Sequence, residues 1–297
     1  MAKFIVTGAT GNIGRATVEQ LLKNGNSVIA ISKTRKLEIT SPKLTSLQLD
    51  LWNKTEVAEF LSQEKPEILI HLAWEATPGE FWHSSRNFDW VSASAHLLDA
   101  FVSAGGRRAI LAGTCAEYQW ANTSLSEDSS PLNPLTAYSA SKLAFKGIAD
   151  VISKEIELVW ARIFFPYHAA EDPNRLLHYI ATNVKASSLP TFNNPRRAVD
   201  LIQLDDVAKI FTELGEQNFC GTINICSGNA LLPDQIGLIF AQILEQKELI
   251  LEFKERLEKV SKLTSIQGDT TKLKSVINLK ELTTIEQGIS QYLKSFK

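Results

Sequence analysis

The chain has 297 residues, a formal net charge of −2, 44% hydrophobic residues and 22% charged residues. These proportions are ordinary for a soluble globular protein, and the charge provides no basic field that would indicate a nucleic-acid partner. Three scattered cysteines, Cys115, Cys220 and Cys226, are too few for a disulfide framework or a cysteine-rich metal site, so we expect no metal. No apolar leader follows Met1, and no apolar run approaches the roughly 20 residues of a spanning helix. We therefore expect a cytoplasmic protein without membrane contact.

The first half of the chain alternates short apolar runs with longer amphipathic ones. The apolar runs predict strands at residues 4–6, 28–31, 44–49, 68–70, 109–111 and 158–164. The amphipathic runs predict helices at residues 14–23, 53–63, 89–102 and 137–154. Repeated strand–helix alternation of this kind is typical of an α/β fold with a doubly wound parallel sheet of the Rossmann type.

The rhythm changes after Phe165, where prolines interrupt the chain and helices then dominate. We expect residues 1–165 to form a dinucleotide-binding Rossmann domain and residues 166–297 to form a smaller, mainly helical substrate lobe. The chain is expected to return in part to the Rossmann sheet near 198–226. The lobe should cover the carboxyl ends of the parallel strands, where such folds bind ligands.

A glycine-rich turn follows the first predicted strand and precedes the first predicted helix. Its sequence is TGATGNIG over residues 7–14. Gly8 permits the tight turn, Gly11 lets the backbone approach a pyrophosphate, and Gly14 lets helix and strand pack closely. The helix N-terminus offers free N–H groups to the phosphates. The turn predicts cofactor contacts from Gly8, Thr10, Gly11, Asn12, Ile13 and Gly14.

The loop after the second predicted strand indicates which nicotinamide cofactor is bound. An acidic residue at the end of this strand would bind the ribose 2′-OH of NAD. Here the strand ends at Ser32, and Lys33 and Arg35 follow without a carboxylate. A hydroxyl followed by cations suits a 2′-phosphate, so NADP is favoured over NAD, although a solvated basic loop would have the same composition.

A tyrosine and a lysine four residues apart, Tyr138 and Lys142, share one face of a predicted helix. A neighbouring ammonium lowers the pKa of a phenol from its usual value of about 10 and so prepares it for proton transfer. Thr114 follows the fifth predicted strand, four residues before Tyr118 and about two dozen before Tyr138. Its hydroxyl can donate a hydrogen bond to a substrate oxygen. We interpret Thr114, Tyr138 and Lys142 as catalytic residues.

Together these motifs resemble the extended short-chain dehydrogenase/reductase family, which contains nucleotide-sugar epimerases, dehydratases and reductases. Arg162 opens a segment similar to the family's R-x-F-N-x-Y-G-P, and residues 204–208 are similar to its V-D-D-V-A. The resemblance implies that Lys142 also holds the nicotinamide ribose and that family members pair as homodimers through the helix of the catalytic tyrosine. It places further cofactor contacts at Asp50, Leu51, Leu72 and Ala73.

The substrate half of the chain departs from the family pattern. Phe165 replaces the asparagine of R-x-F-N, and His168 stands where the family has glycine. Val199 replaces the arginine before the D-D pair, although arginines stand at positions 196 and 197. The aromatic stretch 74–82 forms either a wall against the sugar or an ordinary surface loop. Candidate substrate contacts are Trp74, Glu117, Tyr118, Phe165, His168 and Arg175.

The residues after Thr114 narrow the reaction. The family's 4,6-dehydratases carry Asp-Glu there, because eliminating water needs an extra acid and base. This chain has Cys115 and Ala116, and alanine carries no proton, so dehydration is disfavoured. The related 3,5-epimerase-reductases have a cysteine one place later. On an extended segment Cys115 would therefore point elsewhere, so we interpret it as structural.

The leading hypothesis is an NAD(P)H-dependent oxidoreductase that reduces a 4-keto-6-deoxyhexose carried on a nucleotide. A nucleotide-sugar 4-epimerase is the alternative within this class. A catalytically idle NADP-binding sensor or scaffold is an alternative of another class. Reduction of a carbonyl compound that is not a nucleotide sugar is a further alternative, left open by Phe165 and Val199.

Overall fold

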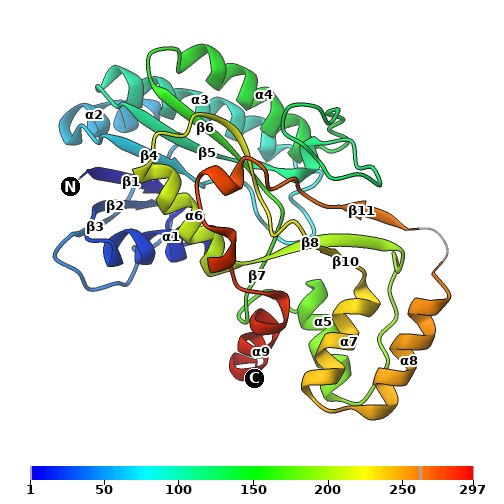
Figure 1. Cartoon of the computed structure of the whole chain (residues 1–297). Helices are drawn as coiled ribbons and strands as arrows, with labels where there is room; N and C mark the ends of the chain where they lie inside the picture. The colour runs from blue at the N-terminus through cyan, green and yellow to red at the C-terminus, as the bar shows by residue number, and fades with distance from the viewer. Residues whose placement is uncertain (1, 261–262, 297) are drawn as a thin grey trace.

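The computed structural model describes residues 2–260 and 263–296. Its larger sheet has seven parallel strands in the order β3-β2-β1-β4-β5-β6-β9 (Figure 1). The strands are β1 (Lys3–Thr7), β2 (Ser27–Ser32), β3 (Leu44–Gln48), β4 (Ile68–His71), β5 (Arg108–Thr114), β6 (Glu157–Ile163) and β9 (Gly221–Ile225). This order reverses direction between β1 and β4, so the carboxyl ends of those strands border a ligand crevice.

Helices cover both faces of this sheet. One face carries α1 (Asn12–Lys23) and α6 (Leu204–Glu216). The other face carries α2 (Lys54–Glu64), α3 (Arg86–Ser103) and α4 (Ala137–Ile152). Alternate residues of each strand face the two layers: Phe4 and Val6 pack in the core beneath α1 and α6, whereas Ile5 packs in the core beneath α2, α3 and α4. The expected doubly wound parallel α/β fold is confirmed.

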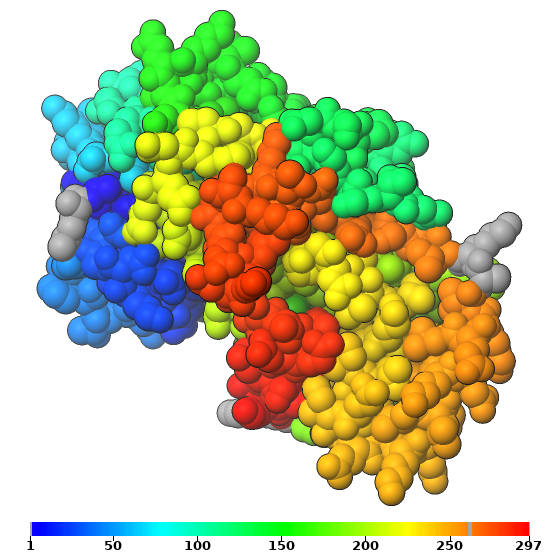
Figure 2. Space-filling view, viewed as in Figure 1, coloured from blue at the N-terminus to red at the C-terminus, as the bar shows by residue number. Residues whose placement is uncertain are grey.

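The rest of the chain builds a second unit, which includes a small sheet. In that sheet β8 (Arg197–Gln203) pairs with β7 (Phe165–Tyr167), β10 (Ala230–Leu231) and β11 (Thr264–Ile266). The accompanying helices are α5 (Leu176–Lys185), α7 (Pro233–Ile243), α8 (Lys247–Glu258) and α9 (Ile285–Ser295). The expectation that residues 166–297 form a mainly helical lobe therefore missed this small sheet. Figure 2 shows α7, α8 and α9 projecting beyond the larger blue-to-green body.

The chain returns to the large sheet between β8 and β10. The returning segment is α6 and β9, and β9 pairs with β6 at the sheet's edge. The expectation of a return near 198–226 holds for these two elements, but β8 itself lies in the small sheet. The buried Arg108 ties the returning segment to β5: its Nε donates to the carbonyl of Leu214 at 2.8 Å and its Nη2 to that of Phe219 at 2.5 Å.

Three short 3₁₀ segments complete the described chain: η1 (Cys115–Glu117), η2 (Leu273–Ser275) and η3 (Leu279–Glu281). Of these, η1 follows β5 directly, so it turns the chain where an extended segment was expected. None of the helices in residues 2–260 and 263–296 combines the length and the apolar character of a membrane span.

Candidate active site

The glycine turn is built for close backbone approach. Gly8 has φ +67°, and a Cβ atom there would lie 2.7 Å from the backbone nitrogen of Ala73 at the end of β4. A Cβ atom on Gly14 would lie 2.2 Å from the carbonyl oxygen of Gly8. Helix α1 begins after Gly11, which has no side chain to cap it, and its described first turn contains no acidic residue. Its N–H groups therefore remain available to phosphates, and these features fit a bound dinucleotide.

The loop after β2 carries the expected basic residues, but one of them is neutralised. Lys33 Nζ lies 2.9 Å from a carboxylate oxygen of Asp50 and 4.2 Å from the ring centroid of Trp52. Arg35 Nη2 donates to the carbonyl of Thr10 at 3.4 Å, across the glycine turn. Ser32 is buried and donates its hydroxyl to the carbonyl of Arg35. Arg35 is thus the cation of this loop that stands beside the phosphate-binding turn.

The three catalytic candidates come from two neighbouring elements. Thr114 ends β5, and Tyr138 and Lys142 lie one turn apart on α4. A capping box fixes the start of α4: Thr136 Oγ1 accepts from the backbone N–H of Ser139 at 3.1 Å, and Ser139 Oγ accepts from that of Thr136 at 3.2 Å. Lys142, Phe145 and Ala149 form the buried face of α4, which sets the direction of the catalytic side chains.

Lys142 is almost fully enclosed, with 3% of its surface exposed. Its ammonium donates to the carbonyl of Ala112 at 2.8 Å and lies 3.8 Å from the ring centroid of Trp74. Burial lowers the pKa of Lys142 to about 7, although the negative charge of Glu117 opposes this change. The lysine therefore changes charge near neutral pH.

Tyr138 is held by aromatic neighbours from the loop after β4. Its ring makes edge contacts with Phe81 and Trp82, with centroid separations of 5.0 and 5.7 Å. Its backbone N–H donates to the carbonyl of Trp82 at 3.2 Å. Burial raises the pKa of Tyr138, and the side chain of Thr114 opposes part of that rise. The aromatic stretch 74–82 therefore packs against both Tyr138 and Lys142.

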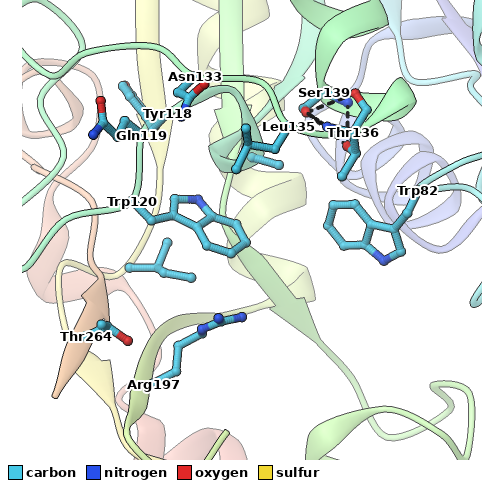
Figure 3. A pocket seen from close by; sticks show the side chains of 12 residues that line it. Trp82, Tyr118, Gln119, Trp120, Asn133, Leu135, Thr136, Ser139, Arg197 and Thr264 are labelled. Carbon is cyan, nitrogen blue, oxygen red and sulfur yellow. Dashed lines mark hydrogen bonds between the residues drawn. The ribbon is translucent and has the colours of Figure 1, made fainter.

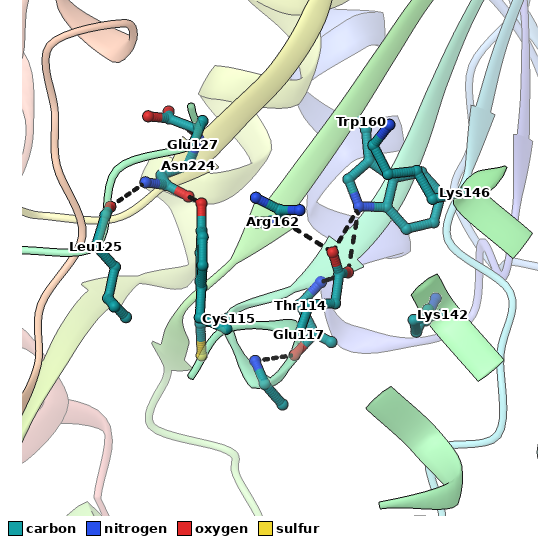
Figure 4. A network of polar contacts seen from close by, with 12 residues as sticks. Thr114, Cys115, Glu117, Leu125, Glu127, Lys142, Lys146, Trp160, Arg162 and Asn224 are labelled. Carbon is teal, nitrogen blue, oxygen red and sulfur yellow. Dashed lines mark hydrogen bonds and ion pairs between the residues drawn. The ribbon is translucent and has the colours of Figure 1, made fainter. Parts of the chain in front are cut away.

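Behind the three catalytic candidates lies a buried polar network centred on Glu117 (Figure 4). Glu117 Oε2 lies 2.8 Å from Nε of Arg162, and Glu117 Oε1 accepts the backbone N–H of Thr114 at 2.8 Å. The indole N–H of Trp160 donates to the same carboxylate. Glu117 is fully buried, so its prediction as a substrate contact is wrong. The turn of η1 directs this side chain back into the sheet.

Cys115 also lies in η1, and the expectation of an extended segment there is wrong. Its side chain is buried in the apolar core of the second unit, and burial raises the pKa of its thiol. This environment agrees with the interpretation of Cys115 as structural, because a buried thiol remains protonated and unreactive.

An open cleft of about 460 Å³ adjoins α4 (Figure 3). We call it the Trp82–Trp120 cleft. Its lining residues are Trp82, Ala116, Tyr118, Gln119, Trp120, Asn133, Leu135, Thr136, Ser139, Arg197, Thr264 and Ile266. Arg197 is the cation of this lining, and its guanidinium lies 5.3 Å from the ring centroid of Trp120. Among the described residues, that guanidinium has no hydrogen-bond or ion-pair partner.

Comparison with known proteins decides the family. Residues 4–226 match the model described as the NAD dependent epimerase/dehydratase family. The chain belongs to this family. The match confirms the resemblance inferred from the glycine turn and from Thr114, Tyr138 and Lys142.

Relatives in the epimerase/dehydratase family align along most of the chain. A UDP-glucuronate 4-epimerase of Thermodesulfobacterium geofontis is 24% identical over 98% of this chain and 95% of the relative. A dTDP-6-deoxy-L-talose 4-dehydrogenase (NAD(+)) of Aggregatibacter actinomycetemcomitans is 27% identical over 76% of this chain and 84% of the relative. The solved structure of MoeE5 with UDP-glucuronic acid and NAD superposes with a TM-score of 0.79 at 22% identity, covering 99% of this chain and 98% of that chain. The structural likeness confirms the fold.

The predicted substrate contacts are scattered. Of the six residues, all within the described chain, Tyr118 lines the Trp82–Trp120 cleft and the other five do not. Phe165 packs against the core of the second unit. Arg175 is exposed and paired with Glu171 at 3.3 Å, and the half-buried His168 has no partner for Nε2 among the described residues. Phe165 and His168 were inferred from a family segment whose residues differ here, whereas Trp74, Glu117 and Tyr118 were inferred from other parts of the chain.

The cleft also contains residues that the sequence analysis did not select. Arg197, Trp120 and Asn133 line it, and the guanidinium of Arg197 at the start of β8 lies near the ring of Trp120 in the loop after η1. A signal for Arg197 was present, because it precedes Val199 by two residues and strand periodicity places both side chains on one face of β8. No comparable pattern marked Trp120 or Asn133.

Proposed function

We propose that this protein is a nicotinamide-dependent oxidoreductase that acts at a hydroxyl or keto carbon of a nucleotide sugar. The observation that supports this most directly is the placement of Thr114 at the carboxyl end of β5 and of Tyr138 and Lys142 on α4, whose first turn contributes Ser139 to an open cleft. The intact set also argues against an idle sensor or scaffold, because binding a cofactor alone would not require the three groups together.

The chain's own residues would perform the proton transfer. A bound nicotinamide would supply or accept the hydride. In the direction of reduction, Tyr138 donates a proton to the substrate oxygen while Thr114 donates a hydrogen bond to that oxygen. The ammonium of Lys142, which lies 6.0 Å from the ring centroid of Tyr138, would stabilise the phenolate form of that tyrosine and would donate to the nicotinamide ribose. Gly11 and the N–H groups at the start of α1 would hold the pyrophosphate, and Gly8 and Gly14 would keep the turn compact. Leu72, Ala73, Asp50 and Leu51 would line the rest of the cofactor site.

The substrate would bind in the Trp82–Trp120 cleft. The guanidinium of Arg197 has no ion-pair partner in the described part of the chain, and it would bind the diphosphate of a nucleotide sugar, since a cation beside an aromatic wall favours an anionic ligand. Arg197 thereby replaces the cation that the family carries at the position of Val199. A nucleotide sugar is preferred over an uncharged carbonyl compound for this reason.

Reduction of a 4-keto-6-deoxyhexose nucleotide is the leading reaction. The segment after Thr114 presents Ala116 to the cleft, and the only carboxylate of η1 (Cys115–Glu117) points into the core. Dehydration would require an acid and a base at this position. The relative named a 4-dehydrogenase is consistent with redox chemistry at a C4 atom.

A 4-epimerase is the second candidate. The relative named UDP-glucuronate 4-epimerase, which aligns over 98% of this chain, favours it. Epimerisation needs the same proton donor and acceptor, Tyr138, used first to oxidise and then to reduce the sugar. It consumes no cofactor overall, whereas reduction consumes one reduced nicotinamide per turnover.

The cofactor is proposed to be NADP in preference to NAD. Arg35 stands beside the glycine turn and can pair with a 2′-phosphate, whereas Lys33 is already bound to Asp50. Titration of NADPH and NADH by fluorescence tests this: Arg35→Ala should weaken NADPH binding while leaving NADH binding unchanged. Equal affinities of the unmodified protein for both cofactors would contradict the preference.

A homodimer formed through α3 and α4 is also proposed. These adjacent helices leave large apolar side chains exposed, among them Phe88 at 61% and Val151 at 64%. The resemblance to a family whose members pair through these helices supports this surface, and the exposed apolar side chains agree with it. Sedimentation of the unmodified protein should give a dimer, and Val151→Glu should give a monomer.

The reaction is tested by incubation with a nucleotide-linked 4-keto-6-deoxyhexose and NADPH. Loss of absorbance at the reduced nicotinamide band identifies a reductase. Inversion of a nucleotide sugar without net cofactor use identifies an epimerase. Absence of both activities, with NADPH bound, would contradict the proposed enzyme and favour the sensor.

A further inference from the structure

We propose that Asn87 is a positioning residue, whose buried amide holds the aromatic neighbours of Tyr138 and Lys142 in place. The inference rests on the proposed roles of Tyr138 and Lys142 in proton transfer and cofactor binding. Asn87 is the second residue of α3, and its side chain is fully buried. It acts on the catalytic pair indirectly, through the segment of residues 74–84 that follows β4.

The amide of Asn87 forms hydrogen bonds on both of its sides. Its Oδ1 accepts the indole N–H of Trp74 at 2.8 Å. Its Nδ2 donates to the carbonyl of Phe81 at 2.7 Å and to the carbonyl of Ser84 at 2.8 Å. An indole nitrogen can only donate and a carbonyl oxygen can only accept, so the three partners fix the orientation of the amide. The position therefore needs one acceptor and two donors on a short side chain, which asparagine supplies.

Trp74 is the partner of Asn87 that reaches Lys142. The ring centroid of Trp74 lies 3.8 Å from Nζ of Lys142, and the opposite contacts of the ring are to Trp90 and Phe145, with centroids 6.2 and 6.1 Å away. An ammonium is attracted to the face of an indole ring, and the same ring covers Lys142 from solvent. The hydrogen bond from the indole to Asn87 sets the direction of that face.

Phe81 and Ser84, the other two partners, lie on either side of the residue that reaches Tyr138. That residue is Trp82, whose carbonyl accepts the backbone N–H of Tyr138 at 3.2 Å. The rings of Phe81 and Trp82 also make edge contacts with the ring of Tyr138. Because Asn87 holds a carbonyl before and a carbonyl after Trp82, the contacts of this segment with Tyr138 depend on the amide.

The proposal is tested at the Lys142 end by Asn87→Ser, since a serine hydroxyl is too short to replace the three hydrogen bonds. Burial lowers the pKa of Lys142 to about 7, so at about pH 9 its amine is neutral and only access limits its reaction with acetic anhydride. Mass spectrometry should show acetylation of Lys142 faster by at least about tenfold, the factor for one lost buried hydrogen bond. Acetylation of Lys146, which pairs with Asp150 on the same helix, should not change.

The Tyr138 end is tested in the same variant by hydrogen exchange, followed by NMR spectroscopy. The backbone N–H of Tyr138 is protected by the carbonyl of Trp82, so its exchange should become faster by a similar factor in Asn87→Ser. The backbone N–H of Ala140 donates to the carbonyl of Thr136 at 2.9 Å within α4, and its exchange should not change.

Asn224→Ser is the matched control. Asn224 is also fully buried, its Oδ1 accepts the hydroxyl of Tyr118 at 2.8 Å, and its Nδ2 donates to the carbonyl of Leu125 at 2.8 Å. This variant should lose stability to a similar extent and leave acetylation of Lys142 and exchange at Tyr138 unchanged. If both asparagine variants changed these two rates equally, general loss of stability would explain the result and the proposal would be overturned.

Asn87→Asp keeps the proposal testable if Asn87→Ser does not fold. The aspartate keeps an oxygen that accepts from Trp74, replaces both donors, and suits the first turn of a helix. Exchange at Tyr138 should become faster in this variant, whereas acetylation of Lys142 should stay as in the unmodified protein. Unchanged exchange at Tyr138 in Asn87→Asp would overturn the proposal.

Turnover separates this proposal from the proposed function. In Asn87→Ser, kcat with a nucleotide sugar should fall by at least about tenfold, because the reacting groups are displaced. An unchanged kcat, or an unchanged rate at either end of a folded Asn87→Ser, would overturn the proposal. Changes at both ends in a protein that turns over no nucleotide sugar would support the role of Asn87 and contradict the proposed reaction. Turnover by the unmodified protein, with neither end changed in Asn87→Ser, would do the reverse.

Discussion

At the scale of single residues, the ring of Tyr138 packs edge-on against two aromatic side chains. Tyr138→Phe removes the phenol and keeps the edge contacts with Phe81 and Trp82. We expect turnover to fall by at least about 10²-fold, because the proton donor is lost. The thermal midpoint and the NADPH dissociation constant should stay unchanged. Turnover equal to that of the unmodified protein would remove Tyr138 from the mechanism.

Lys142 should make the stability of the cofactor-free protein depend on pH. Burial lowers its pKa to about 7 in the folded protein from a usual value of 10.5. Between these values the unfolded chain binds the extra proton, so its contribution to the unfolding free energy rises with pH, by on the order of 1 kcal/mol per pH unit. Below pH 7 the contribution levels off.

Denaturant unfolding at several pH values between 7 and 10 measures this effect. Lys142→Met should reduce the slope of unfolding free energy against pH, because the titrating group is absent. If the slope of unfolding free energy against pH were identical in the two proteins, burial would not lower the pKa of Lys142. Lys146→Met, on the same helix but ion-paired with Asp150, is the comparison variant.

The positions of the three catalytic candidates in the fold were easier to predict from the sequence than those of the candidate substrate contacts. Thr114, Tyr138 and Lys142 follow from fixed spacings within one strand end and one helix turn, which local structure preserves. The direction of Glu117 depends on a single 3₁₀ turn, and its partner Arg162 is 45 residues away in sequence. The spacing of residues along the sequence carries no information on such a pairing. The sequence analysis therefore placed Glu117 at the substrate, whereas its side chain lies in the core.

At the scale of elements, the start of α4 controls the catalytic pair. Thr136→Ala removes the side chain that caps this helix and should cost about 1 kcal/mol of unfolding free energy. Turnover should fall as well, because Tyr138 lies in the first turn of α4. Denaturant unfolding and steady-state rates measure the two effects.

Helix α9 offers a matched control. Thr284 caps it through an equivalent box with Gln287, and neither residue lines the Trp82–Trp120 cleft. Thr284→Ala should lower stability by a similar amount and leave turnover unchanged. If both variants reduced turnover equally, loss of stability alone would explain the effect of Thr136→Ala.

Strong periodicity explains which elements were predicted. The strands β1 to β6 and helices α1 to α4 lie close to their predicted ranges, because buried strands of four to seven residues alternate with amphipathic helices. The strands β7, β10 and β11 have two or three residues each. Segments so short carry no periodic signal, and their pairing with β8 depends on contacts distant in sequence.

At the scale of the whole molecule, the Rossmann core is completed by late parts of the chain. Val207, Phe211, Ile223 and Leu273 belong to the same core as Phe4. A fragment of residues 1–165 lacks all of these and exposes the edge of β6 that pairs with β9. We expect this fragment to aggregate or to lack a cooperative thermal transition. Circular dichroism and sedimentation test this, and a soluble fragment with a sharp transition would contradict it.

The route of the chain between its two sheets also limits how the protein can be recombined. The chain leaves the large sheet after β6, re-enters it at α6, leaves again after β9, and contributes η2 to the first core before ending in α9. A substrate lobe taken from a relative therefore cannot be grafted at one junction. A working chimaera would have to exchange several separate segments at once, and specificity in this architecture changes more readily through point substitutions in the cleft.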